Sequence, residues 1–364
     1  MSPFTAFDES CMRRALALAE RGLYTTDPNP RVGCAIARDG EIVGEGWHRK
    51  AGEAHAEVLA LAHAGEKSRG ATVYVTLEPC AHQGRTPPCA DALIRAAVAR
   101  VVAATQDHNP RVNGAGADKL RAAGIAVDFG LLADEARALN PGFFHRHATG
   151  RPWVRVKLAM TLDGRTALAS GESRWITGEA ARADVQHWRA RSSAVVTGIG
   201  TVLADDPRLD VRICAPGGEM RQPLRVIADA RGRTPPAARI LDAPGECWIV
   251  VGAGTLLDVG ARKATVHEIA KSPSGVDLHA LLGLLAAREL NEVLVEAGPG
   301  LAGAFVAQCL VDELIVYVAP RFLGAEGRPL VLLPPIAQIE GGPAWQITDV
   351  RRFDGDLRIM AIPR

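Results

Sequence analysis

The chain has 364 residues, of which 48% are hydrophobic and 23% charged, and its formal net charge at pH 7 is +1. This composition is typical of a folded globular protein, and the length favours two domains over one hydrophobic core. The near-zero charge argues against the large basic surface of a nucleic-acid-binding protein. No apolar run of about 18 residues occurs, so we expect no membrane span.

The first part of the chain alternates predicted helices and strands. Apolar residues at helical spacing predict a helix over residues 9–22, with Asp8 as its cap. Strands over 34–40 and 41–48 are expected to meet at the Asp39–Gly40 turn. The further predictions are a helix over 53–65, a strand over 71–78, a helix over 90–100, a strand over 101–105, a helix and strand over 116–130, and a helix over 132–150. We therefore predict an α/β domain over residues 1–147.

A second alternating pattern follows and predicts another α/β domain over residues 148–364. The predicted strands lie at 153–160, 192–200, 223–229, 246–252, 292–298 and 312–320, and the predicted helices at 178–191 and 300–310. Glycine, proline and charged residues cluster at 213–223, which predicts an exposed loop.

Two cysteines, Cys80 and Cys89, flank a loop that contains two prolines. By themselves they are compatible with a disulfide, a redox pair, part of a metal site or two unrelated buried thiols. Seven cysteines form an odd number and no export signal is visible, so structural disulfides are disfavoured and a cytoplasmic protein is expected. The other five cysteines stand singly in apolar surroundings and are expected to be buried free thiols: Cys11, Cys34, Cys214, Cys247 and Cys309.

The segment His-Ala-Glu at residues 55–57 supplies partners for these two cysteines. His-x-Glu, then Pro-Cys, then a second Cys that opens a helix is the signature of zinc nucleoside and nucleobase deaminases. His55, Cys80 and Cys89 would leave the fourth position of a tetrahedral zinc open for water, which is the pattern of a catalytic site. Glu57 is then the expected proton shuttle. We predict one catalytic zinc per chain, with a structural zinc and chance occurrence as the alternatives.

Eight residues separate the two cysteines, whereas two usually do so in such deaminases. We expect the longer segment to lie at the mouth of the pocket and to influence substrate choice. Within it, His82 is either a ligand, a substrate contact or a plain loop residue, and Arg85 and Thr86 suit a phosphate or a polar ring edge.

Glycines at 298, 300 and 303 follow a predicted strand and open a predicted helix. Their place near the end of the chain argues against a Rossmann domain, which needs a complete βαβ unit. Glycines still let the backbone approach a diphosphate, whose charge a helix N-terminus favours. The pattern predicts a nucleotide-binding segment, with a plain glycine turn as the alternative.

Long motifs throughout the chain resemble the bifunctional RibD family of riboflavin biosynthesis. They are TxxPNPRVGC, HAE, TLEPCAHQGRTPPC, LDGRTALASGESRWIT, TVLADDPRL and VEAGPGLAGAF, and the eight-residue cysteine spacing is itself a feature of that family. The resemblance implies a cytidine-deaminase-like N-terminal domain and a dihydrofolate-reductase-like C-terminal domain.

The resemblance also implies two activities. The first domain would hydrolyse the 2-amino group of 2,5-diamino-6-(ribosylamino)-4(3H)-pyrimidinone 5′-phosphate with zinc. The second would use NADPH to reduce the ribosyl side chain, giving 5-amino-6-(ribitylamino)uracil 5′-phosphate. The expected partner is thus a small pyrimidine ribosyl phosphate, with no nucleic acid and no membrane, and a homo-oligomer is expected.

Site residues follow from the same resemblance. The zinc ligands would be His55, Cys80 and Cys89, the proton donor Glu57 and the pyrimidine contact Asn29. The cofactor positions would be Ala159, Trp175, Thr201, Asp205, Gly298, Pro299, Gly300, Leu301, Ala302, Gly303 and Ala304. The substrate positions would be Ser173, Arg189, Leu209, Arg212 and Glu296, with Lys157 and Asp163 expected to line the same pocket. Arg189 and Arg212 are candidates for bidentate hydrogen bonds to the substrate phosphate.

Two other interpretations remain open from the residues. A deaminase of tRNA adenosine or of a free nucleoside would share the zinc motif. The near-neutral charge does not supply the basic face that a tRNA needs, and the C-terminal domain would be unexplained. Alternatively, one domain is a non-catalytic scaffold or a ligand sensor.

Overall fold

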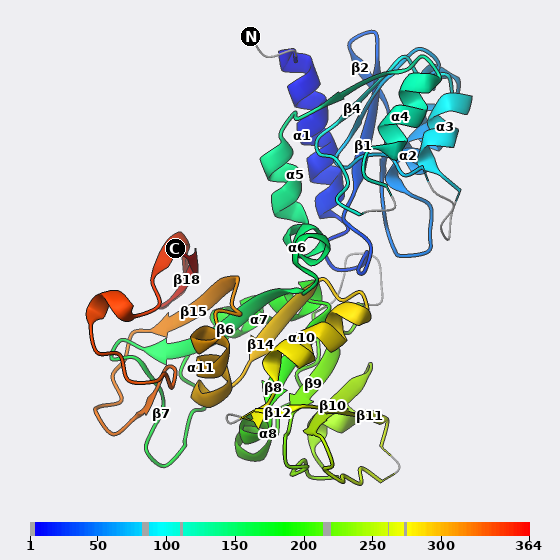
Figure 1. The fold of residues 1–364 in the computed structure, drawn as a ribbon. Helices are drawn as coiled ribbons and strands as arrows, with labels where there is room; N and C mark the ends of the chain where they lie inside the picture. Colours follow the sequence, from blue (N-terminus) through cyan, green and yellow to red (C-terminus); the bar gives the residue numbers. More distant parts are fainter. Residues whose placement is uncertain (1–3, 82–86, 110–111, 214–219, 261, 273–274) are drawn as a thin grey trace. The chain divides into compact units, whose positions relative to one another are not determined.

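The computed structural model describes residues 4–81, 87–109, 112–213, 220–260, 262–272 and 275–364. The chain divides into two compact units, Met1–Gly150 and Arg151–Arg364 (Figure 1). The boundary predicted at 147/148 falls inside helix α6 (Pro141–Thr149), and the division comes directly after that helix. No helix in the described ranges has the length and apolar character needed to cross a membrane.

The first unit is built on a five-stranded sheet of order β2-β1-β3-β4-β5. The strands are β1 (Gly33–Arg38), β2 (Glu41–Trp47), β3 (Thr72–Val75), β4 (Arg100–Ala103) and β5 (Ala126–Phe129). The helices are α1 (Ala6–Glu20), α2 (Ala56–Ala64), α3 (Cys89–Arg95), α4 (Ala115–Ala122), α5 (Ala133–Leu139) and α6, with a 3₁₀ turn, η1 (Gly65–Ser68). Alternate residues of β1 face opposite cores, so Cys34 and Ile36 pack with α2, α3 and α4, whereas Ala35 and Ala37 pack with α1 and α5.

Three predictions for the helices of this unit were wrong. The first helix begins after Thr5, whose hydroxyl accepts the Asp8 N–H at 3.1 Å while the Asp8 carboxylate accepts the Thr5 N–H at 2.8 Å, so Thr5 and not Asp8 is the cap. The helix predicted over 90–100 ends at Arg95, and Arg100 already begins β4. The helix predicted over 132–150 is two helices, because Pro141 lacks the N–H that a continuous helix requires and instead opens α6.

The second unit contains a nine-stranded sheet of order β11-β10-β9-β8-β14-β6-β15-β18-β17. Its strands in that order are Ala264–Ile269, Cys247–Gly252, Leu224–Ala228, Ala194–Gly198, Glu292–Glu296, Trp153–Thr161, Glu313–Ala319, Asp356–Pro363 and Trp345–Phe353. Neighbours from β11 to β15 are parallel, and β18 and β17 complete the sheet in antiparallel fashion. Two short ladders pair β7 (Arg165–Ala167) with β16 (Arg328–Pro329) and β12 (Lys271–Ser272) with β13 (Gly275–Val276).

Helices cover both faces of this larger sheet. One face carries α10 (Leu278–Ala287) and α11 (Pro299–Ala307), and the other carries α7 (Glu179–Arg191), α8 (Ile199–Asp205) and α9 (Arg239–Asp242). A 3₁₀ turn, η2 (Ile339–Gly341), precedes β17. Because the central strands are parallel, their carboxyl ends share one edge of the sheet, where ligands bind in open α/β folds.

The lone cysteines follow the prediction in part. Cys11, Cys34 and Cys247 are buried free thiols, as predicted, and Cys214 lies outside the described residues. Cys309 is exposed, so its predicted burial was wrong. It stands in the turn that ends α11, with a φ of +53°, where the chain has already left the helix face that packs on the core.

Helix α2 packs against bare backbone of β2. A Cβ atom added at Gly46 would lie 2.3 Å from the Ala56 carbonyl oxygen, and one at Gly44 would lie 2.4 Å from the Ala60 carbonyl oxygen. These distances are shorter than any carbon–oxygen contact allows, so the two glycines set how closely α2 approaches the sheet.

We therefore expect Gly46→Ala to lower the free energy of unfolding by roughly 1–3 kcal/mol through overpacking. Thermal unfolding of the full chain measures this effect. Gly283→Ala on α10 is the control, because an added Cβ there meets no atom within 4 Å and removal of a helical glycine stabilises by up to about 1 kcal/mol. Equal melting temperatures for Gly46→Ala and the unsubstituted chain would contradict the packing described.

Candidate active sites

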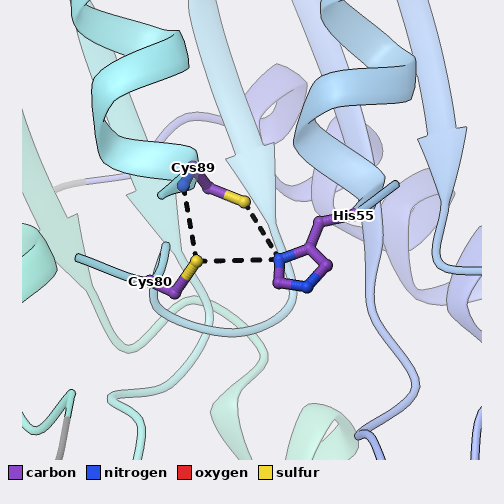
Figure 2. A group of neighbouring side chains, drawn as sticks. All are labelled: His55, Cys80 and Cys89. Atoms are coloured by element: carbon purple, nitrogen blue, oxygen red, sulfur yellow. Dashed lines mark hydrogen bonds between the residues drawn. The ribbon is translucent and has the colours of Figure 1, made fainter. Parts of the chain in front are cut away.

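Three predicted zinc ligands meet in the first unit (Figure 2). His55 is the N-cap of α2, Cys89 is the first residue of α3, and Cys80 lies in the loop that follows β3. The Nδ1 atom of His55 is 3.1 Å from the Cys89 Sγ and 3.6 Å from the Cys80 Sγ. The Cys89 backbone N–H donates to the Cys80 Sγ at 3.3 Å. Two helix starts and one loop thus bring one nitrogen and two sulfur atoms together.

This donor set fits a zinc ion. With Zn–N of ~2.0–2.1 Å and Zn–S of ~2.3 Å, nitrogen and sulfur ligands of a tetrahedral zinc lie about 3.5 Å apart. The two His55–cysteine distances bracket that value. Within the described ranges no fourth histidine, cysteine or carboxylate joins the group, which is the pattern of a catalytic rather than a closed structural site. His82, Arg85 and Thr86 lie outside the described residues.

The two thiols influence each other's ionisation. Hydrogen bonding from Cys89 and then from His55 lowers the pKa of Cys80 to about 4, against the opposing effect of burial. The hydrogen bond to Cys80, together with burial, raises the pKa of Cys89. Zinc binds cysteine as the thiolate, so metal binding is coupled to loss of thiol protons at this site.

Glu57 stands in the first turn of α2, two residues after His55, and is 3% exposed. Burial raises the pKa of its carboxyl group, although His55 opposes the shift. A carboxyl group with a raised pKa beside a metal site, and outside its ligand set, is suited to accept and return a proton.

Asn29 reaches this site through His48, which the sequence analysis missed. The Asn29 Nδ2 lies 3.1 Å from the His48 Nε2, and the His48 Nδ1 lies 3.2 Å from the Ala54 carbonyl oxygen. Since a carbonyl only accepts, Nδ1 of His48 carries the proton and Nε2 accepts from the Asn29 amide. The His48 ring also meets the His55 ring edge-on, at 5.3 Å between centroids. A lone histidine after a strand carries no sequence signal for this role.

Glu78 is a second residue that the sequence analysis missed. Its buried carboxylate accepts four backbone N–H groups at 3.1–3.3 Å, from Asp107, Gly114, Gly116 and Ala117. The contact is tight, because a Cβ at Gly116 would lie 1.8 Å from the Pro79 carbonyl oxygen. Glu78 thereby ties the Cys80 loop to the segment that follows β4.

The second unit contains a cleft of ≈ 1360 Å³. Most residues expected there line it: Lys157, Ala159, Ser173, Trp175, Arg189, Thr201, Asp205, Leu209, Arg212, Glu296, Gly298, Pro299, Gly300, Leu301 and Ala304. Ala302 and Gly303 do not, because the turn of α11 points Ala302 into the core and packs Gly303 against the Leu332 backbone. Asp163 does not line it either, since its carboxylate accepts the N–H groups of Leu323 and Gly324.

The start of α11 faces this cleft. Gly298 is the N-cap, its N–H donates to the Thr201 Oγ1 at 3.1 Å, and Pro299 is the first helical residue. A Cβ added at Gly300 would meet no atom within 4 Å, so the backbone there is open to a ligand. The residues thus fit a diphosphate bound at the N-terminus of a nine-residue helix.

Two buried charged residues of the cleft form an ion pair with each other. Arg189 donates two hydrogen bonds to Glu296, at 2.5 and 2.9 Å, so its guanidinium group faces this carboxylate. Burial would raise the pKa of Glu296, but Arg189 holds it below the usual value. Burial lowers the pKa of Lys157, with Glu296 opposing the shift. Arg212 pairs with Asp210 and is 57% exposed, which leaves it the more accessible of the two predicted phosphate contacts.

These sites define a deaminase-type zinc centre in the first unit and a cleft suited to a nucleotide in the second. Residues 5–105 match the family model described as the cytidine and deoxycytidylate deaminase zinc-binding region, and residues 152–359 match the RibD C-terminal domain. The chain belongs to the RibD family of bifunctional deaminase–reductases of riboflavin biosynthesis.

Relatives match over nearly their whole length. The chain is 50% identical to riboflavin biosynthesis protein RibD of Escherichia coli (strain K12), covering 96% of this chain and 98% of that protein. It is 47% identical to the solved structure of Acinetobacter baumannii RibD, form 1, with a TM-score of 0.91 over 98% of this chain and 99% of that chain. A deaminase/reductase structure from Thermotoga maritima is 32% identical, with a TM-score of 0.84 over 98% and 99%.

The predicted fold class, family and two-enzyme character are thereby confirmed. The deaminase site of this family binds zinc through one histidine and two cysteines, and its reductase domain uses NADPH.

We expect Cys89→Ser to lower the zinc content of the full chain from one ion toward none, because a serine hydroxyl is a poor zinc ligand at neutral pH. Metal analysis after gel filtration measures the content. Cys309→Ser is the matched control, since that thiol is exposed and lies in the other unit. Full retention of zinc by Cys89→Ser would contradict the assigned ligand set.

Proposed function

We propose that the protein catalyses two steps on one pyrimidine ribosyl phosphate. The first is hydrolysis of the 2-amino group of 2,5-diamino-6-(ribosylamino)-4(3H)-pyrimidinone 5′-phosphate, in the unit that ends at Gly150. The second is NADPH-dependent reduction of the ribosyl side chain, in the unit that begins at Arg151. The observation that carries the proposal is the group of His55, Cys80 and Cys89 beside the buried Glu57. The Thermotoga maritima relative, named for both activities, supports the pair of steps.

In the deaminase step, His55, Cys80 and Cys89 hold the metal. Bound zinc supplies a water whose pKa lies near neutrality. Glu57 takes up one proton of the water and gives it to the ring nitrogen. It then takes up the second proton of the water and gives it to the departing amino group, which leaves as ammonia, so that one water is consumed for each ammonia released. Asn29, oriented by His48, hydrogen-bonds the pyrimidine beside the metal.

In the reductase step, the start of α11 binds the diphosphate of the cofactor, and Thr201 fixes that start through the Gly298 N–H. Ala159, Trp175 and Asp205 contact the rest of the cofactor in the cleft. The substrate side consists of Ser173, Arg189, Leu209, Arg212 and Glu296. The chemistry adds a hydride from NADPH and a proton, and it depends on holding cofactor and substrate in contact.

Within the substrate side, Arg212 contacts the phosphate, and Arg189 acts by holding Glu296 ionised. An ionised Glu296 can accept hydrogen bonds from sugar hydroxyl groups. The expected homo-oligomer and cytoplasmic location stay predictions.

Glu57→Gln tests the first step. We expect deamination to fall by roughly 10²–10⁴-fold, because the amide cannot carry a proton between water and ring. Zinc should remain bound, since Glu57 is not one of the three grouped ligands. Ammonia release and metal content measure the two effects in one preparation.

The matched control is Glu53→Gln, which removes an exposed carboxylate from the segment just before α2. It should leave both activity and zinc unchanged. Loss of zinc together with activity in Glu57→Gln would assign this residue a structural role and contradict the proposed shuttle.

A further inference from the structure

Lys157 lines the cleft of the second unit, and its side chain stands between groups from two neighbouring strands. Its own strand, β6, pairs with β14 so that Lys157 lies directly beside Glu296, and with β15 so that Ile315 is its partner. Tyr317 is two residues beyond Ile315 and therefore faces the same side of the sheet. The Lys157 Nζ atom is 5.7 Å from the centroid of the Tyr317 ring, which is within the range of a cation–π contact. A carboxylate on one strand and an aromatic ring on the other thus flank the ammonium group.

The Tyr317 ring is held in its orientation by its hydroxyl group. That hydroxyl donates to the Asp184 carboxylate of α7 at 2.5 Å. The same carboxylate oxygen accepts a hydrogen bond from the Arg358 guanidinium of β18 at 2.8 Å and one from the Trp188 indole N–H at 3.3 Å. The tyrosine is only 1% exposed. Contacts between β15, α7 and β18 therefore fix the ring that faces Lys157.

Tyr317 does not itself serve the reaction as an acid. Burial, and then the hydrogen bond to Asp184, raises the pKa of its hydroxyl group, which therefore keeps its proton. Tyr317 also does not line the cleft, so it does not touch a ligand there. An effect of this residue on reduction must pass through a neighbour that lines the cleft, and Lys157 is the charged neighbour that its ring meets.

The charge of Lys157 depends on its surroundings, because the side chain is removed from water. Burial lowers the pKa of its ammonium group, Glu296 opposes this shift, and Arg189 adds to it. The remaining charged groups on the strands and the helix around Lys157 form ion pairs of their own: Arg155 with Glu292 and Glu313, and Arg358 with Asp184. The face of an aromatic ring carries partial negative charge, so it stabilises the ammonium group without taking its proton.

We propose that Tyr317 is a positioning residue of the reductase step, whose ring holds the Lys157 ammonium group charged and beside Glu296, where it donates hydrogen bonds to the pyrimidine ribosyl phosphate. This inference rests on the proposed reductase function, because it takes the cleft to bind that substrate. An ammonium group offers three donors and no acceptor, so Lys157 binds a substrate oxygen strongly only while it is protonated. Reduction should therefore decline as the pH rises through the range in which Lys157 loses its proton.

The pH dependence of kcat/KM for reduction, measured with the full chain at saturating NADPH, tests the inference. Tyr317→Leu removes the ring, so the alkaline limb of the profile should move to lower pH by roughly 0.5–1 unit, the shift that corresponds to one cation–π contact. Tyr317→Phe keeps the ring and loses only the hydroxyl, and it should restore the limb of the unsubstituted chain. The matched control is Val316→Ala, next to Tyr317 in β15 but with its side chain on the other face of the sheet, which should leave the limb in place.

Lys157→Met shows which group the alkaline limb belongs to, because its residual reduction should lack that limb. Three results would overturn the positioning role and leave the reductase assignment untouched. They are an unshifted limb in Tyr317→Leu, an equal shift in Tyr317→Phe, and a limb that persists in Lys157→Met. If the unsubstituted chain reduces no substrate with NADPH, the proposed reductase function fails and the inference fails with it.

A purely structural role of Tyr317 would give a different pattern. It would lower the melting temperature of Tyr317→Leu and leave the alkaline limb of that variant where it is in the unsubstituted chain. If Tyr317→Leu does not fold, Tyr317→Met is measured in its place, because its longer side chain fills more of the vacated space, and it should show the same shift.

Discussion

The close approach of α2 to β2 is the constraint on which the deaminase site depends. Gly44 and Gly46 expose bare backbone to the helix, and the Cβ-to-carbonyl distances of 2.3–2.4 Å leave no room for a side chain. His55 caps this helix and Glu57 lies in its first turn, so one packing contact places both a metal ligand and the proton shuttle. The opposing thiols are fixed independently, by the start of α3 and by the four N–H groups that hold Glu78 next to the Cys80 loop.

The second unit positions its site through the topology of its sheet and not through one close contact between a helix and a strand. Its parallel strands end at one edge, and the loops after β8, β9 and β14 together line a single cleft. Near the sheet centre, Arg189 and Glu296 form a buried ion pair, and the charge of Lys157 also helps to hold the pKa of Glu296 below its usual value. The floor of the cleft therefore carries buried charges that stabilise one another.

The zinc ligands His55, Cys80 and Cys89 could be predicted from the sequence because zinc binds only a few residue types and these stand in local motifs. The sequence analysis placed most of the cleft by resemblance, but assigned Ala302 and Gly303 to the ligand because a motif does not show which side of a helix faces inward. His48 and Glu78 were missed since their roles come from contacts between distant segments. The sequence analysis also did not predict strands β11, β17 and β18 or helix α10. Helix α10 is apolar nearly all round and β17 is largely exposed, so neither shows a clear amphipathic period.

The central claim is that one chain performs both steps on one substrate. Mass spectrometry of the diaminopyrimidine ribosyl phosphate, incubated with the zinc-loaded chain, first without and then with NADPH, tests it directly. The account predicts replacement of an amino group by oxygen without cofactor, and addition of two hydrogens only when NADPH is present. Deamination without subsequent reduction would contradict the reductase assignment, and an unchanged substrate despite bound zinc would contradict the whole account.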